Sequence, residues 1–129
     1  RQLSEIHGNI WKVRCTRCRE IVDNREVPIA MLPLCRSCGG LLRPHIVWFG
    51  ESLAEEDLDR SAAALQSSDV CLIVGTSGMV YPAAGFGAIA KQAGAFIVEI
   101  NLDSTPHSSL ADATLQGRAR DLVPLLLET

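Results

Sequence analysis

The chain has 129 residues, which suits one domain or one compact domain with a small module attached. Apolar residues make up 47% of it, and 12 basic against 15 acidic residues give a net charge of −3. This charge balance argues against a nucleic-acid-binding surface, and no run approaches the ~18 consecutive apolar residues of a transmembrane helix. Because no signal-peptide pattern opens the chain, we expect a cytoplasmic protein whose thiols stay reduced.

Two Cys-x-x-Cys pairs near the start, Cys15 with Cys18 and Cys35 with Cys38, are the strongest motif. The interval between them, residues 19–34, falls in the range of about 15–20 residues that is typical of structural zinc sites. Two tight turns aim four sulfurs at one ion, and such a closed site supports structure without activating water. Two disulfides or unrelated thiols are the alternatives, and a reducing compartment favours zinc over both.

The segment 10–42 is therefore expected to be a module that zinc holds together, with a charged loop over residues 19–26. An apolar run, LLRPHIVWFGE, follows and predicts a short strand and a loop. The segment 55–69 predicts a helix, because its apolar residues recur at helical spacing and acidic residues fill its first turn.

The remainder of the chain alternates between strand and helix patterns. The run VCLIV is typical of a buried parallel strand. The expected strands cover residues 70–74, 96–101 and 113–115, and the expected helices cover residues 83–94 and 120–127, with Pro124 in the first turn of the last helix or at a kink. This order predicts a βαβ unit with a right-handed crossover.

Polar clusters follow two of these strands. Gly75, Thr76 and Ser77 come after the first, and Asn101 to Asp103 follow the next. Ligands of open α/β sheets bind beyond the carboxyl ends of strands, and backbone N–H groups with hydroxyls suit a phosphate or ribose. Neither G-x-G-x-x-G nor Walker A is present, so a nucleotide site and ordinary turns both remain open. His7 is a candidate general base, with a structural or exposed role as the alternative.

The segments EIHGN, RPHIVWFGE, GTSGMVYPAA and INLDST, together with the two cysteine pairs and in this order, resemble the sirtuin family over roughly residues 3–127. The sequence is most similar to the class shared by bacteria and mitochondria. The resemblance implies an NAD-dependent protein lysine deacylase, a transferase with an α/β fold. It implies a partial Rossmann-like parallel sheet with helices, plus a small zinc-binding module. Its expected parts are a catalytic-loop segment 1–9, a zinc-binding module 10–42, and the C-terminal half of an NAD-binding domain over 43–129.

The resemblance also implies roles for individual residues. His7 matches the catalytic base, and one structural zinc would be bound by Cys15, Cys18, Cys35 and Cys38. The residues that match contacts to NAD are Gly75, Thr76, Ser77, Asn101, Leu102, Asp103 and Ala119. The residues that match the cleft for the substrate peptide are Val47, Trp48, Phe49, Gly50, Glu51 and Val80. That cleft would pair with an extended peptide carrying an acylated lysine, by strand addition.

The implied reaction moves the acyl group from lysine to the ADP-ribose part of NAD and releases nicotinamide. In the family, a Gly-rich first turn, a cofactor loop and a Gln-Asn-Ile-Asp motif precede the His-Gly motif, and none of them is in this chain. We therefore expect a C-terminal part of a catalytic domain, cut out of or descended from a sirtuin, with little activity by itself. The alternative is a non-catalytic zinc-module binding protein derived from a truncated sirtuin. Neither nucleic acid nor membrane is an expected partner.

Overall fold

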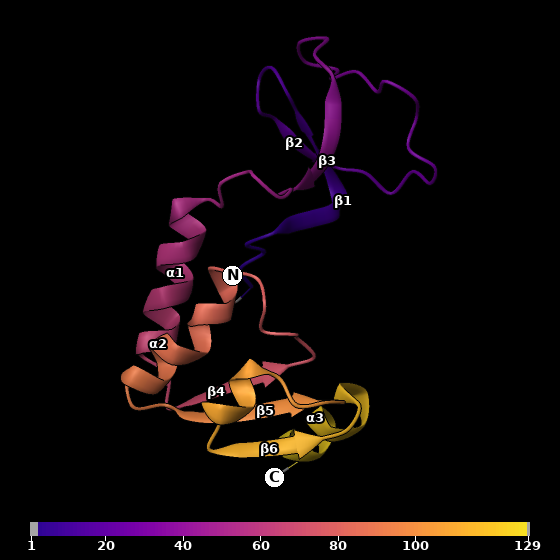
Figure 1. Cartoon of the computed structure of the whole chain (residues 1–129). Helices are drawn as coiled ribbons and strands as arrows, with labels where there is room; N and C mark the ends of the chain where they lie inside the picture. The colour runs from indigo at the N-terminus through magenta and orange to yellow at the C-terminus, as the bar shows by residue number, and fades with distance from the viewer. Residues whose placement is uncertain (1–2, 129) are drawn as a thin grey trace. The chain divides into compact units, whose positions relative to one another are not determined.

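The structure is a computed structural model that describes residues 3–128 and divides into two compact units, residues 1–58 (unit 1) and residues 59–129 (unit 2). Figure 1 shows the order of the elements along the chain. They are β1 (Gly8–Cys15), β2 (Ile21–Asp23), β3 (Leu42–Ile46), α1 (Glu55–Gln66), β4 (Val70–Val74), η1 (Ala83–Gly85), α2 (Phe86–Gln92), β5 (Phe96–Asn101), η2 (Pro106–Ser109), β6 (Ala113–Gln116) and α3 (Ala119–Leu127). Within residues 3–128, every helix is too short or too polar to cross a membrane.

Unit 1 is built on an antiparallel sheet in the order β2-β1-β3. The predicted charged loop over residues 19–26 is wrong at residues 21–23. These residues form the strand β2, in which Ile21 and Val22 pair with β1. Their β-branched side chains suit a strand, and the charged residues flank it on both sides. Three residues are enough for a strand when a longer neighbour such as β1 supplies the backbone partners.

Gly8 shows why a glycine follows His7. Its φ of +81° lies in the left-handed region, and a Cβ at this position would lie 2.1 Å from the carbonyl oxygen of His45 on β3. The N–H of Val47 donates to the carbonyl of His7 at 3.0 Å, directly after this close approach. The glycine therefore lets β1 and β3 meet, and it fixes the backbone on which His7 stands.

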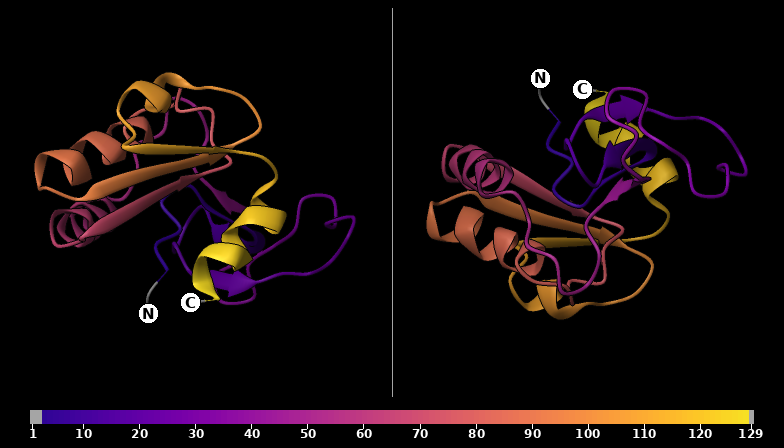
Figure 2. Two further views of the ribbon diagram at one scale, coloured as in Figure 1. Left: turned by 90° about the horizontal axis from the view of Figure 1, so that it is seen from below. Right: turned by 90° about the horizontal axis from the view of Figure 1, so that it is seen from above.

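Unit 2 contains the predicted parallel sheet, in the order β4-β5-β6, with Val70 opposite Phe96 and Val98 opposite Ala113. The predicted strands over 70–74 and 96–101 are confirmed, and β6 is one residue longer than predicted. Helix α2 lies on one face of the sheet (Figure 1), and α3 lies beyond the carboxyl end of β6 (Figure 2). The core consists of Ile73, Ala90, Ala95 and Ile97, and Leu65 of α1 packs against it.

Helix boundaries differ from the predictions for local reasons. The helix expected over 83–94 begins as the 3₁₀ turn η1, and its end is closed by the N–H groups of Gly94 and Ala95, which donate to the carbonyls of Lys91 and Ala90. Helix α1 ends at Gln66, where the hydroxyls of Ser67 and Ser68 take over carbonyls of the last turn. Pro124 lies in the interior of α3, beyond its first turn.

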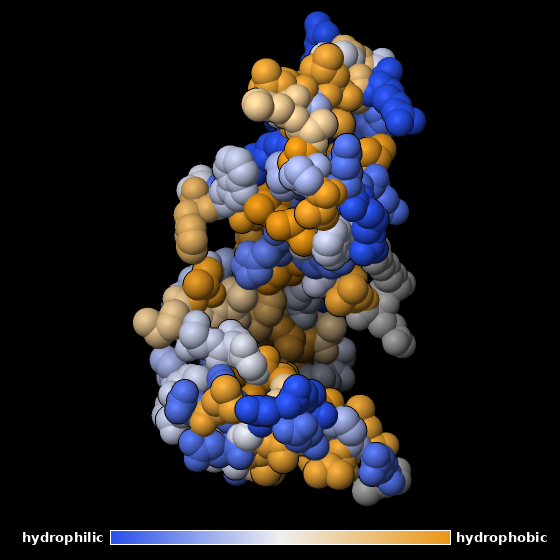
Figure 3. Space-filling model, turned by 90° about the vertical axis from the view of Figure 1, so that its right-hand side faces the viewer, coloured by the Kyte–Doolittle hydropathy of each residue, from blue (hydrophilic) through white to orange (hydrophobic). Residues whose placement is uncertain are grey.

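Strand β4 is not the fully buried strand that its sequence predicts. Ile73 is buried, but Val70, Leu72 and Val74 on the opposite face are 54%, 42% and 38% exposed. Within the described residues, β4 pairs with β5 alone, so it forms one edge of the sheet. Unit 1 also exposes apolar side chains, which lie among charged ones in Figure 3. The continuous apolar run thus marks a strand with one covered face and one open face.

Candidate functional site

The four predicted zinc ligands form one cluster in unit 1. The sulfur atoms of Cys15, Cys18, Cys35 and Cys38 all lie within 4.8 Å of one another. Cys15 Sγ is 3.4 Å from Cys38 Sγ, and Cys18 Sγ is 3.7 Å from Cys35 Sγ. A disulfide needs about 2.05 Å, and all five cysteines are free, so the two-disulfide alternative is wrong. Zinc bonded to four sulfurs at about 2.3 Å would hold them about 3.8 Å apart, so the cluster fits this ion.

The backbone around the cluster is shaped for thiolates. The N–H groups of Cys18 and Arg17 lie 3.4 Å and 3.3 Å from Cys15 Sγ, and these two donors, in this order of importance, lower the pKa of Cys15 to about 6. A Cβ on Gly40 would lie 2.7 Å from the Cβ of Arg17 and 3.0 Å from the Cys15 sulfur. Glycine at this position therefore leaves room for the sulfurs, and the N–H donors favour the ionised, metal-binding form of Cys15.

The segment predicted to bind the substrate peptide, Val47 to Glu51, follows β3 in unit 1. Phe49 is 96% exposed and Trp48 is half exposed, so both are open to a partner. Glu51 is committed to contacts within unit 1: its carboxylate pairs with Arg14 at 3.1 Å and with Arg43, and it accepts a hydrogen bond from the Trp48 N–H at 3.1 Å. The side-chain bond from Arg43, followed by the Trp48 N–H, lowers the Glu51 pKa to about 2.

Arg43 completes this arrangement, since its guanidinium lies 4.0 Å above the Trp48 ring and also donates to the Ile46 carbonyl. Glu51 and Arg43 thus fix the shape of the loop. The sequence could not single out this role, because Arg14 lies 37 positions away from Glu51.

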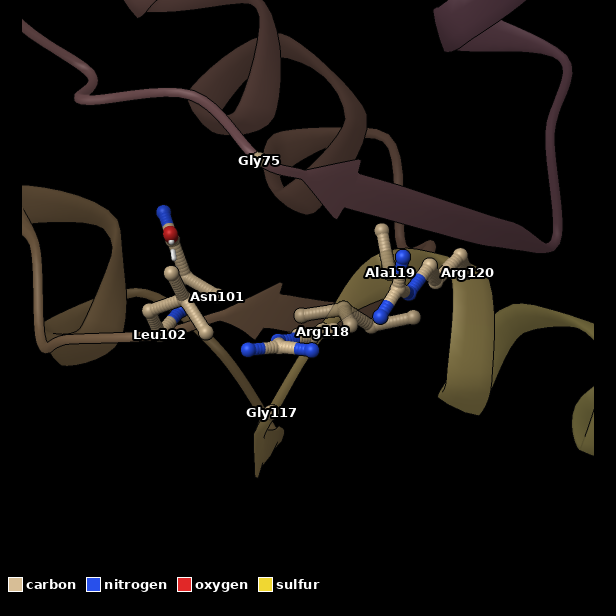
Figure 4. A pocket seen from close by; sticks show the side chains of 8 residues that line it. Gly75, Asn101, Leu102, Gly117, Arg118, Ala119 and Arg120 are labelled. Atoms are coloured by element: carbon tan, nitrogen blue, oxygen red, sulfur yellow. Dashed lines mark hydrogen bonds between the residues drawn. The ribbon is translucent and has the colours of Figure 1, made fainter.

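A second candidate site is a cavity of about 600 Å³ at the carboxyl ends of the strands of unit 2. Figure 4 shows Asn101 and Leu102 on one side of it, and Arg118, Ala119 and Arg120 on the other. The lining comprises Gly75, Ile100, Asn101, Leu102, Gly117, Arg118, Ala119 and Arg120. Four of these were predicted as cofactor contacts, and their position beyond the strands is where open α/β sheets bind ligands.

Hydrogen bonds hold this end of the sheet in place. Asn101 Nδ2 donates to the Thr76 carbonyl at 2.7 Å, and the Gly75 N–H donates to the Ile100 carbonyl at 2.9 Å. Asn101 therefore joins the loop after β4 to the end of β5 while it lines the cavity. Thr76 and Ser77 lie in that loop but do not line the cavity.

The other predicted positions have different surroundings. Asp103 lines a smaller neighbouring cavity of about 60 Å³. Val80 lies in the loop after Gly78 in unit 2 and is exposed, while His7 is exposed in unit 1. Sequence reasoning missed Arg118 and Arg120, whose signal was their place in the Gly-Arg-Ala-Arg run just after β6. The Arg118 guanidinium has no hydrogen-bond or ion-pair partner within residues 3–128, so it is available to an anionic ligand.

Comparisons with known proteins point to one family. A sequence model described as the Sir2 family matches residues 1–82. The NAD-dependent protein deacylase 2 of Pyrobaculum aerophilum is 49% identical to this chain, with 99% of the chain and 51% of that protein covered. The NAD-dependent protein deacylase of Pyrococcus abyssi is 44% identical, with 96% and 52% covered. The chain thus spans about half the length of the curated relatives it matches.

A solved structure agrees with these sequence matches. The crystal structure of a Sir2 homolog–NAD complex superposes with a TM-score of 0.92 and 42% identity, covering 98% of this chain and 50% of that one. The sequence relationship and the fold therefore lead to the same family.

Proposed function

This chain belongs to the Sir2 family, and we propose that it is the part of an NAD-dependent protein lysine deacylase that carries the catalytic histidine, a structural zinc site and half of the NAD site. The observation that carries the proposal is the cavity at the ends of β4, β5 and β6, since its lining includes Gly75, Asn101, Leu102 and Ala119. The similar Sir2 homolog is described as a complex with NAD, which supports the same ligand here. In this proposal, residues 1–9 are the catalytic loop, 10–42 the zinc module and 43–129 the cofactor half.

The cysteine cluster would hold one zinc ion that supports unit 1 and takes no part in the reaction. Four sulfur ligands leave no open coordination position for water or substrate. The short distances among the four sulfurs and the space left by Gly40 support this role.

NAD would be the co-substrate, supplying the ribose carbon that accepts the acyl group when nicotinamide leaves. Asn101 and Leu102 would contact the adenosine half, Gly75 to Ser77 the phosphates and ribose, and Ala119 the adenine. Arg118 adds positive charge to a cavity that has no carboxylate in its lining, which suits a phosphate-bearing ligand, whereas Arg120 beside it is paired with Asp121 at 3.5 Å.

His7 would act as general base and accept a proton from a ribose hydroxyl. The exposed imidazole stands on backbone that the Gly8 approach and the Val47 hydrogen bond hold in place. The loop of unit 1 that Glu51 fixes would pair with an extended peptide carrying an acylated lysine. Val80 of unit 2 would be a further contact to that peptide. A similar solved structure is described as Sir2 with a p53 peptide and NAD⁺, at 28% identity and a TM-score of 0.86, over 99% of this chain and 55% of that one.

The test joins this chain to the upstream half of the Pyrobaculum aerophilum relative and measures deacylation of an acyl-lysine peptide at varied NAD. His7→Ala should lower kcat by about 10²–10⁴-fold, the usual contribution of a general base, without changing the melting temperature. Asn101→Ala should mainly raise KM for NAD. Asp59→Ala, an exposed change on α1, is the control and should leave both constants unchanged. A His7 variant with normal turnover, or a rate independent of NAD, would contradict the proposal, and no deacylation at all by the unaltered joined protein would favour a non-catalytic binding module.

A further inference from the structure

Unit 2 buries a carboxylate that the proposed reaction does not use. Glu99 lies on β5 and is 2% exposed, and its two oxygens accept hydrogen bonds from the hydroxyls of Thr105 and Ser108. A buried carboxylate is costly unless strong hydrogen bonds compensate for its lost hydration. Glu99 therefore binds the segment around η2 firmly to the middle strand of the sheet.

The same two hydroxyls also close the first turn of η2. Thr105 Oγ1 accepts a hydrogen bond from the His107 N–H at 3.0 Å, and Ser108 Oγ accepts one from the Thr105 N–H at 2.9 Å. This reciprocal arrangement is a capping box. Each hydroxyl donates a hydrogen bond to Glu99 and accepts one from a backbone N–H of the cap. Both the position of η2 and its internal geometry therefore depend on this carboxylate.

His107 extends from η2 to the loop after β4. Its side chain is 6% exposed, and a Cβ on Gly78 would lie 2.5 Å from its Cδ2 and 2.6 Å from its Nε2. On the side of α2, a Cβ on Gly87 would lie 3.7 Å from its Nδ1. The imidazole is thus packed between the loop and the helix, in contact with the backbone of Gly78.

Besides the contact with His107, the loop over residues 75–78 is held by two hydrogen bonds near its first residues. Gly75 bonds to Ile100, and the Thr76 carbonyl accepts from Asn101, both from the end of β5. At its far end, the Gly78 N–H bonds within residues 3–128 only to Thr76 of the same loop, at 3.3 Å. The close contact with the buried His107 ring therefore supports this end of the loop on the body of unit 2.

We propose that Glu99 and His107 are positioning residues for the cofactor loop: Glu99 fixes η2, and η2 presses the His107 ring against Gly78. This inference rests on the proposed function, in which residues 75–77 contact NAD. It assigns to η2 and His107 a role in cofactor affinity, although neither lines the cavity at the strand ends.

The experiment is a double-variant cycle on this chain with His107→Ala, Gly78→Ala and both together. It measures ADP-ribose affinity by NMR titration, and the amide shifts and ¹⁵N relaxation of Thr76 to Gly78 without ligand. His107→Ala should mobilise these amides and weaken ADP-ribose binding by roughly tenfold, as expected if the loop is in its binding position only about a tenth of the time. His107→Leu, which refills the space, should restore most of the affinity. Glu99→Gln, which removes one acceptor oxygen, should mobilise η2 and the loop together.

The steric contact predicts non-additivity. Gly78→Ala has two costs: its Cβ would clash with the His107 ring, and its φ of +67° is strained for alanine. His107→Ala removes the clash but leaves the strain. The double variant should therefore bind ADP-ribose no more weakly than Gly78→Ala alone. Independent, multiplying losses, or loop amides unchanged by His107→Ala, would overturn the inference. If the unaltered chain, which holds half of the NAD site, does not bind ADP-ribose, the affinities are measured on the protein joined to the upstream half, and lack of binding there refutes the NAD assignment. The amide measurements on this chain still decide whether His107 positions the loop.

Discussion

Removal of the zinc should unfold unit 1. The buried apolar residues of residues 3–58 are Val13, Cys15 and Cys35, and two of these three are zinc ligands. Burial of Val13 contributes about 1.5–3 kcal/mol, whereas a structural zinc contributes about 10–16 kcal/mol in small modules. Because the remaining core is so small, the sheet β2-β1-β3 should not persist without the metal. Cys15→Ser replaces the most buried ligand with a poor one and should have the same effect.

The assay combines metal analysis with NMR of the reduced protein before and after chelation. We expect one zinc per chain in the unaltered protein. Chelation or Cys15→Ser should collapse the dispersed amide signals of β1 and β3, while those of β5 persist. Cys71→Ser is the matched control, since Cys71 lies on β4 outside the cluster and should keep the zinc. A folded, reduced protein with zinc stoichiometry near zero, or a sheet that survives chelation, would refute the reasoning.

Three further predictions concern stability and association. Gly8→Ala should destabilise unit 1 in a urea titration by more than the roughly 1–2 kcal/mol that left-handed backbone costs, because its Cβ would also meet the His45 carbonyl; an unchanged midpoint would contradict this. The lowered Glu51 pKa means that its stabilising contribution is complete above about pH 4.3 and lost as the pH falls towards about 2, so Trp48 fluorescence should change over that interval and stay flat in Glu51→Gln. The exposed apolar face of the edge strand β4 should let copies of this chain associate, so the unaltered chain should sediment above its monomer mass and Leu72→Lys should lower that mass; an unchanged mass would exclude that face as the contact.

Short sequence patterns predicted the cysteine cluster and two strands of unit 2. The spacing of the cysteines predicted the cluster, and apolar runs predicted β4 and β5 to the residue. The short strand β2 was missed, because three residues are too few to show an alternating pattern and its neighbours are charged. The exposed face of β4 could not be predicted either, since an apolar run does not tell which face is covered.

In the candidate sites, too, some residues could be predicted from the sequence and others could not. Residues at strand ends, such as Asn101, could be predicted because parallel strands end at one edge of a sheet. The fixing of Glu51 by Arg14 and the contact of His107 with Gly78 join positions far apart in sequence, so they became visible only in three dimensions. Arg118 carried a weak signal, since a basic residue after a short strand is common on any surface.

We propose that this chain supplies the catalytic residue and half of the cofactor contacts of an NAD-consuming deacylase. The most direct measurement is the ratio of nicotinamide released to acyl groups removed, with the chain joined to the upstream half of the Pyrobaculum aerophilum relative. We expect one nicotinamide per lysine released, and His7→Ala should lower the formation of both products together by about 10²–10⁴-fold. Deacylation without nicotinamide release, or equal rates with and without NAD, would contradict it.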